Sequence, residues 1–231
     1  MTTGSRIVFE GVEVDLSLPV RRPGPGRGGA RKGAGRKPKG EVAMHTHLTR
    51  LEIPEDKPVL ATVKIDKGLP SLRTPETRAL LLDCLYHNKH RGGFRIAHFT
   101  IRADEMQFVV EPETRHAMTF GMQGLMIRIA RNLNRMWGRK GRVFADRYHE
   151  RVLEKTHEVH EVLQSMLDAD PETHEYSSAP WCDGFEEPVT TPESERMHKP
   201  VIQPHTWLLA SGWKRHGLLK GRVRPARRPR D

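Results

Sequence analysis

The pattern of hydrophobic and polar residues changes period several times along the middle of the chain. Residues 58–65 (PVLATVKI) and 94–101 (FRIAHFTI) are rich in β-branched and aromatic residues, which favours strands. Residues 105–112 (EMQFVVEP) indicate a third strand, joined to the second through the short connection 102–104. We therefore expect three strands before residue 113, the last two of them consecutive.

Two segments have the three- and four-residue spacing of amphipathic helices. Thr74 suits an N-cap and Pro75 a first helical position, whereas Gly92 and Gly93 favour a stop, so a helix is expected between them. A longer helix is expected within 113–141. There the apolar residues recur at Met118, Met122, Leu125, Met126, Ile129, Leu133, Met136 and Trp137.

Two further elements are expected at the end of this region. Residues 142–154 indicate a strand or hairpin, and 156–170 a helix with Thr156 as its N-cap. The order β-α-β-β-α-β-α is that of an α+β fold, a ferredoxin-like β-α-β-β-α-β sandwich with an added C-terminal helix. In the simplest arrangement the helices cover one face of an antiparallel sheet and leave the other face or its rim for a partner.

Composition divides the chain into three parts. Residues 1–56 are expected to be a mostly disordered basic arm, 57–170 the folded domain, and 171–231 an irregular extension. This extension begins as a polar, Pro-rich surface excursion and ends in a basic tail, with a short packed helix expected within 206–219. The two basic tails would then flank the domain.

The clearest part of the N-terminal arm is the segment 21–40, which contains eight Lys or Arg and no acidic residue. A chain of this composition has too little apolar surface to fold alone. Its stretch GRKPKG is loosely similar to an AT-hook, a motif that lies in the minor groove of DNA. A non-specific basic arm is the alternative interpretation.

The net charge narrows the choice of partner. The 231 residues include 39 Lys and Arg against 29 Asp and Glu, a formal net charge of +10, which favours polyanions such as nucleic acid.

The apolar runs are too short to span a membrane, and the N-terminus lacks the pattern of a signal peptide. Cys84 and Cys182 form neither a CxxC motif nor a disulfide framework. A cytoplasmic protein without a membrane partner is expected.

The placement of positive charge along the long predicted helix is periodic. Arg128, Arg131, Arg135 and Arg139 recur every three or four residues beside the apolar stripe. Such a row is either a solvated helix face or a surface for phosphate groups. The candidate DNA-binding residues are Arg128, Arg131, Arg135, Arg139, Lys140, Arg142 and Arg147.

Glu105 and Gln107 are unusual in a strand that otherwise reads as buried. They lie two residues apart, so their side chains point to the same face of an extended chain. One interpretation is a strand end or edge with a wet face. The other is a polar site, either working or remnant.

Several stretches of the chain resemble the single-tyrosine HUH transposases, in particular the branch of REP-associated tyrosine transposases. The most specific is NRMWGRKGRVFADRYHER, at the end of the longer matching run 121–151. The resemblance implies a ferredoxin-like fold that binds single-stranded or hairpin DNA. Active members cut one strand through a 5′-phosphotyrosine with Mg²⁺ or Mn²⁺. The other matching stretches are GLPSLR (68–73), GFRIAHFTI (93–101) and 158–163, with weaker similarity at YSSAPW (176–181) and 206–219.

The chemistry of this family uses two His side chains one residue apart on a strand to hold the metal ion, a Tyr on the last helix as the nucleophile, and a polar residue one turn later. By the resemblance these positions fall on Glu105, Gln107, Ser165 and Ala169. No catalytic residue is therefore assigned and no cofactor is expected. Glu105 alone is a weak candidate ligand for a hard cation.

Two competitors for these roles are present elsewhere in the chain. His45 and His47 stand one residue apart but precede the first predicted strand. The tyrosines are Tyr86, Tyr148 and Tyr176; the first two match core positions of the family, and Tyr176 is the candidate for a displaced nucleophile.

The sequence favours a transposase-family DNA-binding protein whose catalytic positions are degenerate, rather than an enzyme. One alternative is an active metal-dependent DNA strand transferase with rearranged residues. Another is an RNA-binding or protein-interaction module on the same sandwich. Nucleotide-binding enzymes are disfavoured, because neither a P-loop nor a Gly-x-Gly-x-x-Gly motif opens a helix. The resemblance is compatible with a monomer or a homodimer.

Overall fold

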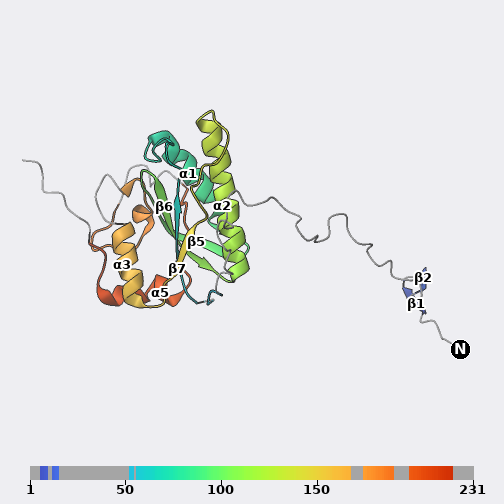
Figure 1. Ribbon diagram of the computed structural model, residues 1–231. Coiled ribbons are helices and arrows are strands. Elements are labelled where there is room, and N and C mark those ends of the chain that lie inside the picture. The colour runs from blue at the N-terminus through green and yellow to red at the C-terminus, as the bar shows by residue number, and fades with distance from the viewer. Residues whose placement is uncertain are drawn as a thin grey trace, which may run out of the picture. The chain divides into compact units, whose positions relative to one another are not determined.

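The computed structural model describes residues 6–9, 12–15, 52–54, 56–167, 174–189 and 198–220 (Figure 1). The chain divides into two compact units, 1–49 and 50–231. In the first unit, β1 (Arg6–Phe9) and β2 (Val12–Asp15) form an antiparallel pair that the sequence did not predict. The basic segment 21–40, its AT-hook-like stretch and the pair His45 and His47 lie outside the described residues.

The second unit is an α+β fold built on a five-stranded antiparallel sheet with the order β4-β5-β6-β3-β7. The three strands expected before residue 113 are confirmed. The two-residue strand β4 was not predicted, and only part of 142–154 becomes a strand. The strands are β3 (Val59–Lys64), β4 (His90–Arg91), β5 (Phe94–Ile101), β6 (Glu105–Pro112) and β7 (His149–Val152).

Four α-helices accompany the sheet within the described residues: α1 (Pro75–Asn88), α2 (Arg115–Met136), α3 (Thr156–Met166) and α5 (Trp207–Ala210). None of these helices is both long and apolar enough to cross a membrane. The predicted cap of α1 is confirmed, because Thr74 Oγ1 accepts a hydrogen bond from the Thr77 backbone N–H at 3.2 Å.

The predicted cap of α3 is wrong. Thr156 is the first helical residue, and Lys155 occupies the N-cap position. The Glu158 carboxylate accepts hydrogen bonds from the backbone N–H groups of Glu154 and Lys155 at 2.8 and 3.1 Å. These bonds lower the pKa of Glu158. A side chain from inside the helix therefore satisfies the amides of the two residues that precede it.

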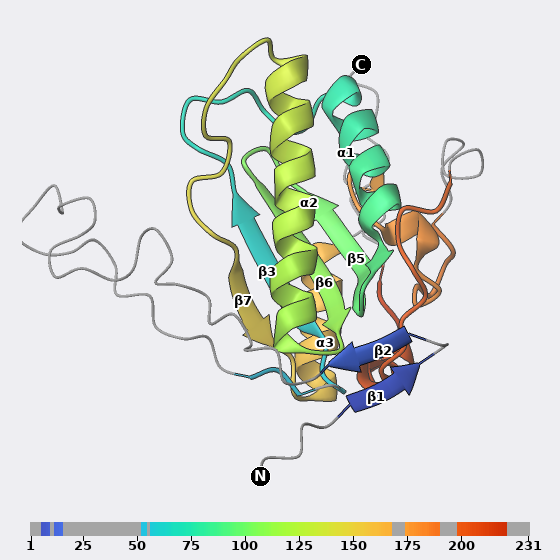
Figure 2. The same ribbon diagram turned by 90° about the vertical axis from the view of Figure 1, so that its right-hand side faces the viewer.

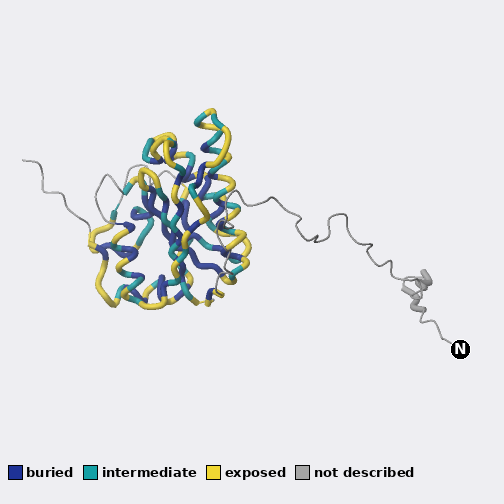
Figure 3. The backbone as a smooth tube through the Cα atoms, viewed as in Figure 1, coloured by how far each residue is buried: buried dark blue, intermediate teal, exposed yellow. Residues whose placement is uncertain are grey.

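Helices α1 and α2 pack side by side on one face of the sheet (Figure 2). The strands and the inner sides of these helices form the first core, which is dark blue in Figure 3. Gly121 allows the close approach of α2 to β5, because a Cβ atom there would lie 2.1 Å from Phe94 Cγ. The first core includes Val59, Ala61, Val63, Leu81, Leu85, Phe94, Ile96, Phe108, Met118, Met122, Leu125, Ile129 and Leu133.

The opposite face of the sheet is also covered over part of its area, which corrects the simplest arrangement expected from sequence. Helix α3 lies there (Figure 2), and the described parts of 171–220 pack with it into a second core. Trp213 is 1% exposed, and its Nε1 donates to the Leu209 carbonyl at 2.9 Å. Gly184 is needed beside it, because a Cβ atom there would lie 2.2 Å from Trp213 Cη2. The second core includes Ala97, Val109, Leu153, Val159, Val162, Leu163, Ala179, Leu208, Leu209 and Trp213.

A buried carboxylate on β6 holds the C-terminal segment against this face. Glu111 is 4% exposed and accepts hydrogen bonds from the backbone N–H groups of His205 and Thr206, each at 2.7 Å. The Thr206 hydroxyl donates a third bond to the same carboxylate at 2.7 Å. Because Thr206 is also the N-cap of α5, one acidic side chain fixes where this helix begins.

We expect the substitution Thr206→Val to lower the free energy of unfolding by about 2 kcal/mol, because it removes a hydrogen bond to a buried charge together with a helix cap. Thr206→Ser keeps the hydroxyl and serves as the matched control, with an expected loss below about 1 kcal/mol. Urea unfolding of the three proteins measures both effects. Equal stability of the Val and Ser variants would show that this hydroxyl does not anchor the segment.

Candidate nucleic-acid interface

Glu105 and Gln107 share one face of β6, as their spacing predicted. Val109 on the same side belongs to the second core, whereas Met106 and Phe108 point into the first. Gln107 Nε2 donates to Glu105 Oε1 at 3.1 Å. The same oxygen lies 3.3 Å from Nη1 of Arg102, an exposed residue at the turn before the strand. The acid and the amide therefore form a polar pair at the start of β6.

Ser165, far along the chain from β6, lies beside Gln107. Both residues line a pocket of about 180 Å³ between the sheet and α3. Ala169, the fourth position implied by the resemblance, lies outside the described residues. The fold thus brings a strand position and a helix position of the predicted site together. The pocket is lined by Leu60, Gln107, Arg151, Glu161, Val162, Ser165 and Met166.

The groups at this site do not fit a divalent cation. Hard cations take carboxylate and carbonyl oxygens, but the Glu105 carboxylate is paired with Arg102 and accepts the Gln107 amide. Within the described ranges, no three His, Cys, Asp or Glu side chains gather to hold a metal ion. None of the residues lining the pocket is a histidine that could act as a base for Ser165.

The three tyrosines lie away from this pocket. Tyr148 is buried in the first core, and Tyr176 packs against that core with Arg73 4.8 Å from its ring centroid. Tyr86 projects from α1, and its ring stacks on His198. None of the three tyrosines lines the pocket that holds Gln107 and Ser165.

Histidines also lie on this side of the sheet. His149 on β7 is exposed and shares the face of Gln107, because both residues are register partners of Thr62. A second histidine on this side is inaccessible. His98 on β5 is 5% exposed, and its Nδ1 lies 3.2 Å from Ser178 Oγ. Burial lowers the pKa of His98 to about 4, so the ring is neutral near pH 7. This histidine serves packing under the C-terminal segment.

The predicted DNA-binding residues fall into two groups. Arg128, Arg131 and Arg135 are exposed on α2, and this helix covers the face opposite to the Gln107 pocket. We call these three residues the α2 stripe. The stripe and the pocket are therefore on opposite sides of the sheet, a separation that periodicity in the sequence could not reveal.

The second group lies in the connection between α2 and β7. The backbone N–H of Ala145 donates to the Lys64 carbonyl, and that of Asp66 to the Val143 carbonyl. These bonds tie the connection to the end of β3, where Lys64 lies opposite Glu105 of β6 in the strand register. We call Arg139, Lys140, Arg142 and Arg147 the sheet-end group.

The sheet-end group is partly ordered by its own contacts. Arg142 Nε lies 3.0 Å from Asp66 Oδ2, which lowers the pKa of this aspartate. Arg139 Nη1 donates to Asn134 Oδ1 at 3.1 Å. Sequence reasoning missed the exposed Lys64 and Arg102 at the same end. Their position at strand ends flanking the Glu105 site was the signal that could have identified them.

Comparisons with known proteins add a distant structural likeness. No protein-family model matches the chain, and no curated protein matches it. A solved structure described as "Structure of the REP associates tyrosine transposase bound to a REP hairpin" is similar with a TM-score of 0.42 and 13% sequence identity. The match covers 53% of this chain and 70% of that one. A likeness of this size does not establish a shared activity.

We expect Mn²⁺ to leave the thermal unfolding midpoint of this protein unchanged at concentrations that saturate a specific site. The reason is that Arg102 already balances the charge of Glu105. The substitution Arg102→Ala would free the carboxylate and is the positive control, with Arg102→Lys as its matched partner. A Mn²⁺-dependent rise in the midpoint of the unmodified protein that disappears in Glu105→Gln would contradict the expectation.

Proposed function

We propose that this protein binds single-stranded or hairpin DNA and does not cut it. The observation that carries the proposal is the meeting of Gln107 and Ser165 in one pocket. The resemblance to HUH transposases assigned catalytic positions to these residues from sequence alone. They lie far apart in the chain, and both line this pocket, with a different chemistry on each.

The connectivity of the sheet supports a ferredoxin-like sandwich. The chain runs β3-α1-β5-β6-α2-β7, and these strands lie in the spatial order β7-β3-β6-β5. Along the chain, each helix connects two strands that are not adjacent in the sheet, as a split β-α-β arrangement requires. In this proposal β4 and the packed C-terminal segments are additions to that framework.

Binding is proposed to rest on phosphate contacts from the sheet-end group. Its residues stand at the same end of the sheet as Glu105, together with the exposed side chains of Lys64 and Arg102. Arginine pairs with phosphate in a bidentate geometry, and each neutralised phosphate releases counterions. The α2 stripe lies on the other side of the sheet, so it would contact a different part of the DNA or only solvent.

The absence of cutting follows from the side chains at the aligned positions. A serine hydroxyl without a base is a weak nucleophile near neutral pH. A metal ion that polarises a scissile phosphate stabilises the transition state by several kcal/mol, and the pair Glu105 and Gln107 does not supply the ligands for it. Two requirements of strand cleavage are therefore missing together.

The first test looks for a covalent intermediate. We expect no protein–DNA adduct on a denaturing gel after incubation with labelled hairpins and Mn²⁺. The combined change Glu105→His, Gln107→His and Ser165→Tyr restores the family's chemistry at three positions, and each single change should have no effect. An adduct of the unmodified protein that is lost in Tyr176→Phe, Tyr148→Phe or Tyr86→Phe would overturn the proposal in favour of an active strand transferase.

The second test measures how affinity depends on salt. Each phosphate neutralised in a single strand contributes about 0.7 to the slope of log affinity against log salt. We expect Lys140→Ala with Arg147→Ala to flatten this slope by about 1.4, because both side chains are exposed at the sheet end. Arg91→Ala, an exposed arginine on β4, is the control and should leave it unchanged.

The same measurement on Arg131→Ala with Arg135→Ala decides the role of the α2 stripe. A flattened slope would identify the stripe as a phosphate surface, and an unchanged slope would identify it as a solvated helix face. Competition between RNA and DNA hairpins of the same sequence completes the test. Preference for RNA would favour the RNA-binding alternative, because contacts to the 2′-hydroxyl distinguish the two.

A further inference from the structure

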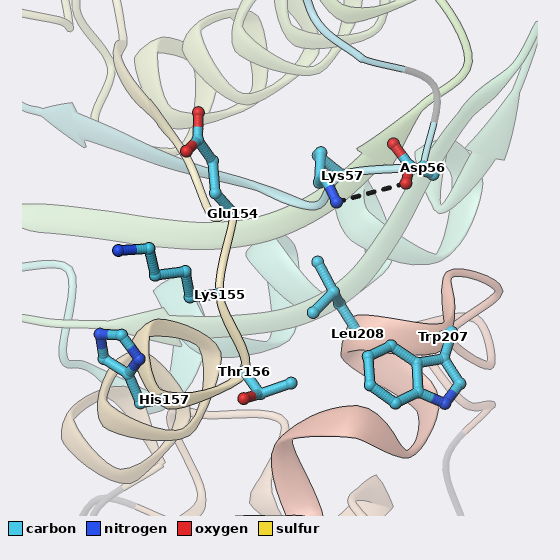
Figure 4. Close-up of a pocket in the computed structure, with 8 residues that line it drawn as sticks. All are labelled: Asp56, Lys57, Glu154, Lys155, Thr156, His157, Trp207 and Leu208. Atoms are coloured by element: carbon cyan, nitrogen blue, oxygen red, sulfur yellow. Dashed lines mark ion pairs between the residues drawn. The ribbon is translucent and has the colours of Figure 1, made fainter.

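A second and larger pocket lies at the other end of the sheet. It has a volume of about 490 Å³ and is formed by three segments: the approach to β3, the start of α3, and α5 (Figure 4). We call it the Trp207 pocket. It is lined by Asp56, Lys57, Glu154, Lys155, Thr156, His157, Trp207 and Leu208. Its volume is in the range of small-ligand sites.

Trp207 is a large aromatic side chain held in an exposed position. Its indole is 53% exposed, whereas Trp213 six residues later is 1% exposed. The hydrogen bonds that Thr206 donates to Glu111 fix the backbone immediately before it, and the buried Leu208 fixes the backbone after it. The ring is therefore presented by an anchored helix start.

The surroundings of this ring are cationic on more than one side. The Arg215 guanidinium lies 4.9 Å from the Trp207 ring centroid. Lys57 reaches toward the middle of the pocket, while Lys155 and His157 lie together on the side away from Trp207 (Figure 4). Asp56 pairs with Lys57 at 3.2 Å, but its side chain is 75% exposed, so this pair is weak and screened by salt.

Two features keep the pocket in shape. Thr156 Oγ1 lies 2.8 Å from His216 Nε2, which links the start of α3 to the segment that carries Arg215. The backbone N–H groups of Glu154 and Lys155 already donate to Glu158. These two amides, which precede the helix, are thus occupied. What the pocket offers to a ligand is the indole and the lysines, beside the carboxylates of Asp56 and Glu154.

We propose that the Trp207 pocket binds one nucleotide of single-stranded DNA, with its base stacked on Trp207 and its phosphate facing Lys57 and Lys155. Stacking on an aromatic side chain is a sequence-tolerant way in which proteins bind unpaired bases. A cationic peptide is the less suitable ligand, because Arg215 already lies against the ring and both lysines would repel it.

This inference rests on the proposed DNA binding and adds a second contact point to it. Both pockets follow α3: Thr156 and His157 line one, and Glu161 and Ser165 the other. Thr156 and Ser165 are nine residues apart, about 14 Å along the helix axis. A single strand that leaves a hairpin at the sheet end and follows α3 would reach the Trp207 pocket.

The test compares a blunt DNA hairpin with the same hairpin carrying a single-stranded tail of six thymidines at either end. We expect the tail to raise the affinity of the unmodified protein, and Trp207→Ala to reduce the affinity for the tailed hairpin by about tenfold while leaving that for the blunt one unchanged. Trp207→Phe keeps an aromatic ring and should retain most of the gain. Trp137→Phe, at the end of α2, is the matched control.

A second readout separates this pocket from the proposed function. Trp207 is the most exposed of the tryptophans with a described exposure, so binding of free oligothymidine should quench the intrinsic fluorescence, and Trp207→Phe should abolish the quenching. If no hairpin is bound but this quenching occurs, the hairpin proposal fails and the pocket stands. No effect of the tail, an equal loss for both hairpins in Trp207→Ala, or a tighter complex with a uridine tail would each overturn the pocket assignment.

Discussion

The burial of Glu111 is the constraint on which the second face of the sheet depends. A carboxylate that is 4% exposed is tolerated only when strong donors surround it, and here three hydrogen bonds from His205 and Thr206 do so at 2.7 Å. The acceptor is on β6 and the donors are about 95 residues later. One side chain thereby connects the centre of the sheet to the end of the described chain.

The consequence is a sheet face with two different halves. Toward the end of β6, the C-terminal segment covers Val109 and Glu111 and builds a second core around Trp213. Toward the start of β6, Glu105 and Gln107 stay partly exposed beside α3. The covered half is packed around a second core and presents Trp207, while the open half carries Glu105 and Gln107. The two pockets of this face arise at either end of the covered region.

Charge is distributed unevenly around this framework. The α2 stripe and the sheet-end group follow one another in sequence. From the sequence alone they would be taken for a single basic surface. Hydrogen bonds from Ala145 and Asp66 fold the connection after α2 back onto β3, which brings the sheet-end group to the end of the sheet where Glu105 lies. The buried residues of this connection, Val143, Phe144 and Tyr148, pack in the first core, as α2 does.

Most of the strands and helices could be predicted from local sequence patterns, because they are set by the spacing of apolar residues and by caps such as Thr74. The shared face of Glu105 and Gln107 followed from the alternation of a strand. Long-range hydrogen bonds and packing could not be read in this way. Four features depend on residues that are distant in the chain: the Glu111 anchor, the covered second face, the exposure of Trp207 and the separation of the two arginine groups. The spacing of residues along the sequence does not show which distant donor will bind a buried acceptor.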